Sequence, residues 1–96
     1  MTCNIKIGKH AQLNLNTTIC HDCSIGDFFT SAPAVNISGN CEIGNEVYFG
    51  TNSCLKEKIK VCDNVIIGMG AVVIKDITEQ GTYVGNPANK LTKIMA

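Results

Sequence analysis

The feature that most limits how this chain can fold is a six-residue repeat that runs without insertion from residue 1 to residue 78. Thirteen consecutive hexads begin with an apolar residue, except for one that begins with Ser31. The fifth position is small or apolar throughout, and the fourth position is Asn, Asp or Gly in eight of the hexads. Asn, Asp and Gly are the residue types that most readily adopt the left-handed backbone of a sharp corner.

A period of six with apolar first and fifth positions matches neither an amphipathic helix nor one long alternating strand. It indicates short strands joined by corners, with three sides closing each coil of 18 residues. We therefore predict an all-β fold, a left-handed parallel β-helix of about four coils, with neighbouring strands about 4.8 Å apart. The β-helix domain is expected over residues 1–78. Residues 79–96 are expected to form a C-terminal loop and short tail, with one or two helical turns over 88–95.

Residues 18 apart should stack directly on each other in such a coil. Ser31 would then lie next to the bulky Phe49 of the following coil, where a small residue avoids overpacking. We therefore interpret Ser31 as a packing residue rather than a catalytic serine. Cys23 and Cys41 fall in one inner column and are expected to act as small buried hydrophobic residues.

Charge and cysteine content narrow the classes of partner. Eight basic and eight acidic residues cancel without a basic cluster, so neither nucleic acid nor an anionic membrane is an expected partner. No apolar run is long enough to span a bilayer, and the N-terminus lacks the form of a signal peptide. Six cysteines without a signal peptide indicate reduced thiols in the cytoplasm.

The stretch TICHDCSIGDFF, residues 17–28, carries the candidate chemistry. Its two cysteines have only one histidine nearby and one of them faces inward, so no metal site is expected. His21 lies beside a corner, where side chains face outward, and Asp22 can stabilise its imidazolium form. Gly39 lies one coil later and would let a ligand approach its backbone N–H. A base, an acidic neighbour and an N–H donor suit acyl transfer; the alternative is an exposed corner histidine without a catalytic role.

Four stretches, NTTICHDCSIGD, GNCEIGNEVYFG, VIIGMGAVVIKDI and YVGNPANKL, together resemble the C-terminal β-helix of the hexapeptide-repeat acetyltransferases. The most similar branch is the sialic acid O-acetyltransferase and UDP-amino-sugar N-acetyltransferase family. The resemblance implies a homotrimer that transfers an acetyl group from acetyl-CoA to an amine or hydroxyl of a sugar or sugar nucleotide. It also implies that His21 is the general base, that Asp22 strengthens it, and that the Gly39 N–H binds the thioester carbonyl.

The resemblance further implies where acetyl-CoA binds, in the groove between adjacent subunits of the trimer. Thr51 and Met69, which are 18 residues apart, match positions that line this groove together with Gly39. Thr30 stands where family members usually carry a second histidine, nine residues after the first. Threonine can donate a hydrogen bond there but cannot carry charge. Lys75 is a possible partner for the phosphates of the cofactor, although an exposed lysine is usually only solvated.

Family members also carry an N-terminal sugar-nucleotide-binding domain, whereas the first hexad here begins at Met1. The chain is therefore expected to be a truncated or split family product, or an excised domain. Lys90, in the C-terminal segment, is a second possible phosphate partner. Two other functions remain open. A zinc enzyme of the carbonic anhydrase type would need three histidines, and the chain has only His10 and His21. A β-helix that only trimerises as a scaffold is the other alternative.

Overall fold

The computed structural model describes residues 4–91, and within this range all regular structure is β-strand. The strands are β1 (Lys6–Ile7), β2 (Gln12–Leu13), β3 (Thr18–Ile19), β4 (Ser24–Ile25), β5 (Thr30–Ser31), β6 (Asn36–Ile37), β7 (Glu42–Ile43), β8 (Tyr48–Phe49), β9 (Cys54–Leu55), β10 (Lys60–Val61), β11 (Val65–Ile67), β12 (Val72–Val73), β13 (Gly81–Val84) and β14 (Asn89–Lys90). The described residues include no helix long and apolar enough to cross a membrane.

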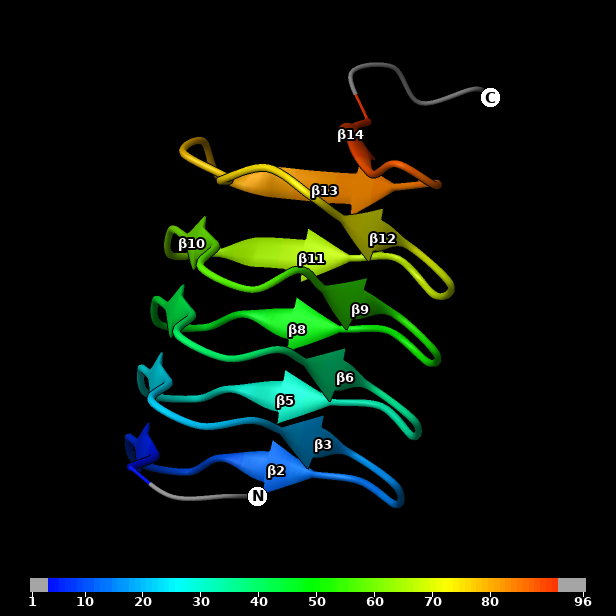
Figure 1. Cartoon of the computed structure of the whole chain (residues 1–96). Coiled ribbons are helices and arrows are strands. Elements are labelled where there is room, and N and C mark those ends of the chain that lie inside the picture. The colour runs from blue at the N-terminus through cyan, green and yellow to red at the C-terminus, as the bar shows by residue number, and fades with distance from the viewer. Residues whose placement is uncertain (1–3, 92–96) are drawn as a thin grey trace.

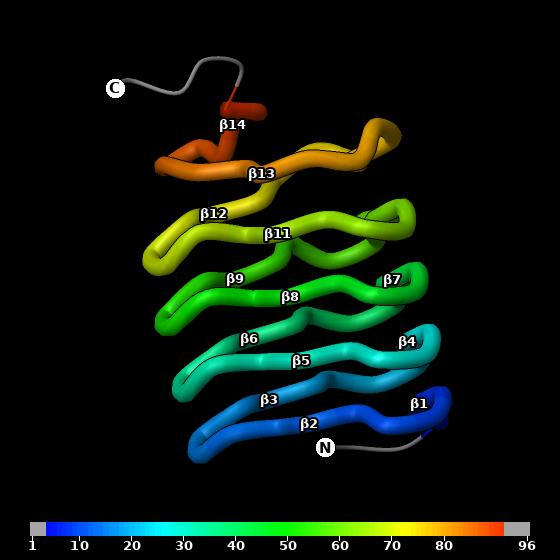
Figure 2. Tube along the Cα trace, turned by 180° about the vertical axis from the view of Figure 1, so that it is seen from behind, coloured from blue at the N-terminus to red at the C-terminus, as the bar shows by residue number. Residues whose placement is uncertain are grey.

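The strands form three sheets that run along the sides of a solenoid of about four coils (Figure 1). Sheet A has the order β1-β4-β7-β10, sheet B the order β14-β13-β11-β8-β5-β2, and sheet C the order β12-β9-β6-β3. Successive coils lie on one another as parallel rungs from the N-terminus to the C-terminus (Figure 2). The predicted β-helix architecture is confirmed.

The sheets meet at three corners, which we name after the sheets they join. The A–B corner comprises residues 8–11, 26–29, 44–47 and 62–64, one segment from each coil. The B–C corner comprises residues 14–17, 32–35, 50–53 and 68–71. The C–A corner comprises residues 20–23, 38–41, 56–59 and 74–77. These corners differ in side chains although they follow the same backbone path, and the candidate chemistry depends on that difference.

The core confirms the predicted 18-residue columns. Ile19, Ile37, Leu55 and Val73 are in register in sheet C and are almost completely buried. Burying apolar side chains on all three inner faces is the main term that favours the coil over the unfolded chain. The apolar first positions of the repeat are therefore the residues that line the inner surface of the solenoid.

Ser31 pairs with Phe49 in register and is fully buried, as its packing role requires. The rings of Phe29 and Phe49 lie 5.7 Å apart between centroids, so a larger side chain at residue 31 would have little room. The Ser31 hydroxyl is also 2.9 Å from Thr17 Oγ1, which satisfies it by a hydrogen bond. This serine is structural.

The corners contain a left-handed residue at every sixth position. Gly70 has φ +70°, and eleven other residues have φ between +56° and +62°. The eleven are Asn4, His10, Asn16, Asp22, Phe28, Ala34, Asn40, Glu46, Asn52, Lys58 and Asn64. Asn and Asp tolerate this conformation, whereas other non-glycine residues lose about 1–2 kcal/mol there. The repeat thus imposes the conformation even where the local residue disfavours it. Asp76 holds the fourth position of the last hexad, where the repeat predicts the same corner conformation, but it does not have a positive φ.

The C-terminal segment continues the solenoid before it turns back. β13 pairs parallel with β11, and β14 pairs antiparallel with β13. The predicted helical turn is therefore wrong for residues 88–91, and residues 92–95 lie outside the described part. The physical reason is that the open edge of β13 offers unpaired backbone groups. The segment forms hydrogen bonds with that edge, including one from Leu91 N to Thr82 O at 2.7 Å.

Candidate active site

The C–A corner brings His21, Asp22 and Gly39 together, on two adjacent coils. His21 follows β3 and occupies the third position of its hexad, so its side chain leaves the corner outward. Nδ1 of His21 lies 3.1 Å from Oδ2 of Asp22, and the two side chains are about half exposed, 53% and 48%. A carboxylate at this nitrogen favours the tautomer with a proton on Nδ1. Nε2 then has a free lone pair and can accept a proton from a substrate.

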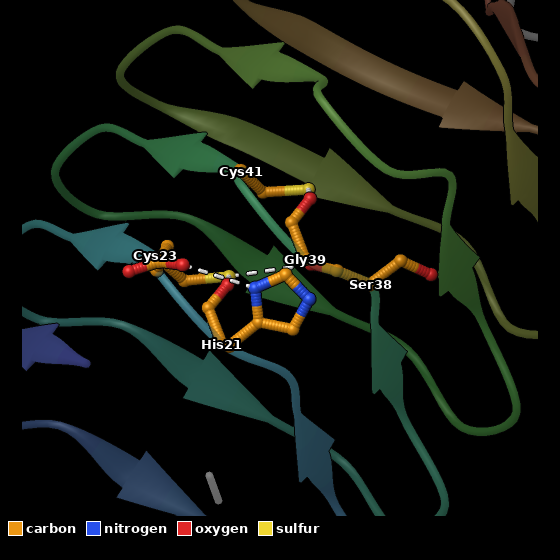
Figure 3. Close-up of polar contacts among 6 residues, drawn as sticks. His21, Cys23, Ser38, Gly39 and Cys41 are labelled. Atoms are coloured by element: carbon orange, nitrogen blue, oxygen red, sulfur yellow. Dashed lines mark hydrogen bonds and ion pairs between the residues drawn. The ribbon is translucent and has the colours of Figure 1, made fainter. Parts of the chain in front are cut away.

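Gly39 lies directly against the imidazole of His21 (Figure 3). A Cβ at Gly39 would be 2.8 Å from both Cε1 and Nε2 of His21, closer than real carbon contacts allow. The glycine is therefore needed for the position of the histidine ring, in addition to the access to its N–H that the sequence indicated. Any side chain here would displace the ring.

The backbone N–H of Gly39 has no hydrogen-bond acceptor among residues 4–91. In the first three coils the equivalent third-position N–H groups of the A–B corner are occupied, each by a side chain one coil further along. Lys9 N donates to Asp27 Oδ1, Asp27 N to Asn45 Oδ1, and Asn45 N to Asp63 Oδ1, each at 2.7 Å. Because both corners repeat one backbone path, the Gly39 N–H should also point outward and toward the following coil.

The carbonyl of the same peptide bond is bound from inside the core. Cys23 Sγ lies 3.2 Å from Ser38 O and 3.7 Å from the carbonyl of His21. Cys41 makes the equivalent contacts one coil later, 3.3 Å to Lys56 O and 3.7 Å to Gly39 O. Sequence reasoning predicted that both cysteines are buried but missed these contacts. Burial raises the pKa of the Cys41 thiol, which keeps it protonated and able to donate.

The residues predicted to line the cofactor groove lie elsewhere on the chain. Thr51 and Met69 are in the B–C corner, where Thr51 is half-buried and Met69 is 80% exposed. Thr30 is in β5, on the outer face of sheet B. The width of sheet C separates Thr51 and Met69 from His21. One copy of the chain therefore does not assemble the whole predicted site.

The two candidate phosphate partners differ in their surroundings. Lys75 is exposed and stands in the same column as His21, three coils further along. Lys90, in β14, pairs with Glu79 at 3.4 Å, which already engages its ammonium group. Lys75 is therefore the better available of the two for binding an anion.

A groove of about 740 Å³ runs along the outer face of sheet A and extends to the A–B corner, where Asn45 and Asp63 line it. Its polar lining includes Ser24, which is three residues after His21, and Glu42 and Lys60 on the following coils. The groove offers hydroxyl, carboxylate and ammonium groups within a few coils of the imidazole. No three His, Cys, Asp or Glu side chains of residues 4–91 are grouped so that they could hold a metal ion.

Comparison with known proteins shows that this chain is similar to several acetyltransferases. Galactoside O-acetyltransferase of Escherichia coli (strain K12) is 32% identical over 111 aligned positions, which cover 95% of this chain and 55% of that protein. GDP-perosamine N-acetyltransferase of Escherichia coli O157:H7 is 33% identical over 96 positions, covering 94% of this chain and 43% of that protein. No family model matches the chain.

Solved structures agree. The acetyltransferase domain of PglB from Neisseria gonorrhoeae FA1090 superimposes with a TM-score of 0.84 at 30% identity, covering 93% of this chain and 52% of that one. WeeI from Acinetobacter baumannii AYE gives 0.86 at 39% identity, covering 92% and 44%. The chain is a homologue of the hexapeptide-repeat acetyltransferases. Its solenoid is the left-handed β-helix of that family.

This hexapeptide-repeat chain spans about half the length of the relatives that it matches, 55% of the galactoside enzyme and 52% of the PglB domain. The PglB domain has also been solved in complex with acetyl coenzyme A, and that structure gives a TM-score of 0.84 at 30% identity. The matched region is thus the part of these acetyltransferases that forms coils like those described above.

Proposed function

We propose that this chain is the catalytic β-helix of an acetyltransferase that moves an acetyl group from acetyl-CoA to a hydroxyl or amine of a sugar or sugar nucleotide. The observation that carries the proposal is the arrangement of His21, Asp22 and Gly39 at one corner of a hexapeptide-repeat homologue. Named relatives act on galactosides and GDP-perosamine, which supports a sugar acceptor. The solved complex of the PglB domain with acetyl coenzyme A supports acetyl-CoA as the donor.

In the proposed reaction the acceptor and acetyl-CoA bind together. Nε2 of His21 takes the proton of the attacking hydroxyl or amine, and Asp22 stabilises the resulting imidazolium. The new C–O or C–N bond forms as the C–S bond breaks. The Gly39 N–H stabilises the negative charge that develops on the thioester oxygen. The CoA sulfur leaves and receives a proton from the imidazolium, which returns His21 to its starting state.

We propose further that the site is completed in a homotrimer. His21, Gly39 and Lys75 belong to the C–A corner, whereas Thr51 and Met69 belong to the B–C corner and Thr30 to sheet B. A ligand that contacts both groups needs the C–A corner of one copy beside the B–C corner of the next. Threefold symmetry, a common closed form of oligomer, supplies that contact three times. The exposed Met69 side chain is the kind of residue that such a contact would bury.

The cellular location belongs to the same proposal. Five cysteines of the described range are unpaired thiols: Cys20, Cys23, Cys41, Cys54 and Cys62. Unpaired thiols persist in reducing compartments. The cytoplasm is therefore the compartment we propose.

Titration calorimetry of acetyl-CoA into the purified chain tests the proposal, together with light scattering to measure the size of the oligomer. We expect saturable binding at one site per subunit of a trimer. A His21→Ala variant should keep this binding but lose transfer to galactoside and GDP-perosamine acceptors. A folded trimer that binds no acetyl-CoA would contradict the proposal.

A non-catalytic trimeric scaffold is the second candidate, and the residue at position 30 favours it. Thr30 stands where the resemblance implies a second histidine, and threonine cannot hold a charge near the cofactor. Under this alternative the trimer forms but the titration shows no heat of binding. The same experiment therefore separates the two functions.

A further inference from the structure

We propose that Cys23 is a positioning residue: its buried thiol holds the Ser38–Gly39 peptide bond so that the Gly39 N–H faces outward to the candidate site. This inference rests on the proposed function for its catalytic meaning, because that function gives the outward N–H its role. The orientation itself rests on geometry alone and can be tested without any substrate.

The first step of the argument is the planarity of the peptide bond. The Ser38 carbonyl and the Gly39 N–H belong to one peptide unit, and in a trans peptide they point in opposite directions. Ser38 O lies 3.2 Å from Cys23 Sγ, and Cys23 is only 1% exposed. The carbonyl therefore faces the core, and the N–H of the same unit must face away from it.

The second step is that the peptide bond needs a restraint. Glycine accepts backbone conformations that other residues avoid, so a peptide bond next to Gly39 can rotate at low cost. No backbone N–H within residues 4–91 donates to Ser38 O, which leaves the thiol as its one hydrogen-bond partner in that range. The thiol therefore favours the outward orientation of the N–H over a flipped one.

The third step is a comparison of the three corners. In the B–C corner the carbonyl of Gly50 is held by Ser53, which donates from N at 3.2 Å and from Oγ at 2.7 Å. Ser53 occupies the same hexad position as Cys23, so a polar atom at this position can bind a corner carbonyl. In the A–B corner the N–H groups of Lys9, Asp27 and Asn45 are held by side-chain oxygens instead. In the C–A corner a thiol holds the Ser38 carbonyl, and the Gly39 N–H has no acceptor among residues 4–91.

The experiment is NMR of the chain with ¹⁵N-labelled glycine, in the natural sequence and in three variants. Cys23→Ala removes the donor, and Cys23→Ser keeps a donor on a side chain of similar size. Cys41→Ala is the matched control, because Cys41 is equally buried in the same column but makes no contact with Ser38 O; its contacts are with Lys56 O at 3.3 Å and, more distantly, Gly39 O at 3.7 Å. Without ligand, we expect one sharp Gly39 amide signal in the natural sequence, in Cys23→Ser and in Cys41→Ala. In Cys23→Ala we expect a second or broadened signal.

Acetyl-CoA and free CoA then serve as probes. Acetyl-CoA should shift the Gly39 amide proton downfield and free CoA should not, because only the thioester has the carbonyl that accepts this hydrogen bond. Cys23→Ala should lose this difference. It should also lower kcat about fivefold with little change in the KM for acetyl-CoA, a modest effect because a thiol is a weak donor. Cys23→Ser should restore both the difference between the two probes and kcat. The pH profile of kcat should be the same in both variants as in the natural sequence.

Two results would overturn the inference. One is a single, unchanged Gly39 signal in Cys23→Ala without ligand. The other is an equal loss of kcat and of the acetyl-CoA-dependent shift in Cys23→Ala and Cys41→Ala. That result would mean that both residues act only through stability. If acetyl-CoA leaves the Gly39 amide of the natural sequence unshifted, the proposed function fails at its donor, while the ligand-free spectra still decide the role of Cys23.

Discussion

The A–B and C–A corners follow the same backbone path but use their third-position N–H groups in opposite ways. In the first three coils of the A–B corner, this N–H (Lys9, Asp27 and Asn45) donates to an Asp or Asn side chain on the next coil. In the C–A corner the Gly39 N–H has no acceptor among residues 4–91. The first arrangement ties coils together, and the second leaves a donor exposed, which the proposed function assigns to the thioester. One repeat can thus use the same backbone group differently at two corners.

The residue at the second hexad position explains why the third-position N–H finds a side-chain acceptor in the A–B corner but not at Gly39. In the A–B corner a Cβ would overlap the oxygen that accepts the hydrogen bond, so glycine is required there. The three positions are Gly8 beside Asp27, Gly26 beside Asn45, and Gly44 beside Asp63. The C–A corner has Cys20, Ser38 and Lys56 at the equivalent positions. A side chain there blocks the approach of such an oxygen and keeps the N–H open.

The largest expected effect is a difference in kcat between variants of the two histidines. His21→Ala should lower kcat by about 10²–10⁴, the usual contribution of a general base. His10→Ala, in the A–B corner, should leave kcat within about twofold, because His10 only stacks on Phe28 with ring centroids 5.2 Å apart. Steady-state acetyl transfer by both variants checks this. Equal losses in the two variants would remove the C–A corner from the mechanism.

The next largest effect should come from giving the Gly39 N–H a side-chain acceptor within the chain. The double variant Ser38→Gly with Glu57→Asn copies the A–B arrangement and should bring an amide oxygen to the Gly39 N–H. We expect kcat to fall about 10²-fold, the loss seen when one such donor is removed, while the thermal midpoint stays the same or rises. Glu57→Asn alone is the matched control and should retain activity, since Ser38 still blocks the oxygen. If the single variant is as inactive as the double, the comparison of the corners is wrong.

A pair of glycine substitutions should separate activity from stability. Gly39→Ala places a Cβ against the His21 ring, which can move, so activity should fall more than stability. Gly44→Ala places a Cβ 2.8 Å from Asp63 N and 2.9 Å from the carbonyl carbon of Cys62, which cannot move independently. Overpacking of this kind costs about 1–3 kcal/mol. Urea unfolding and acetyl-transfer rates, measured on both variants, give the comparison.

The smallest effect should be the same at both corners. Glu46 and Lys58 have φ values of +56° and +60°, and both side chains are exposed. Asn tolerates this conformation better, so Glu46→Asn and Lys58→Asn should each stabilise the chain by about 0.5–1 kcal/mol. Denaturation midpoints measure the gain, and kcat should not change. Unequal gains would show that the corners differ in backbone strain as well as in their side chains.

Much of the fold was predictable because the hexad reports the inner face of each coil. The apolar first and fifth positions gave the three-sided coil, the 18-residue register and the burial of Cys23 and Cys41. The conformation of His10, Phe28 and Lys58 was not predictable from their residue types, since the repeat forces a left-handed backbone on them. The C-terminal segment has no hexad, and its pairing with β11 and with itself depends on a sheet edge that exists only after folding.

For the site, the sequence by itself determined which residues share a corner. The 18-residue spacing of His21 and Gly39 stacks them, and the order of His21 and Asp22 makes them neighbours. Only the tertiary structure decided that the imidazole covers Gly39, that Cys23 binds the Ser38 carbonyl, and that Lys90 pairs with Glu79. The physical reason is that a repeat fixes the level and side of each residue, whereas hydrogen bonds depend on rotamers and peptide orientations within an otherwise identical coil.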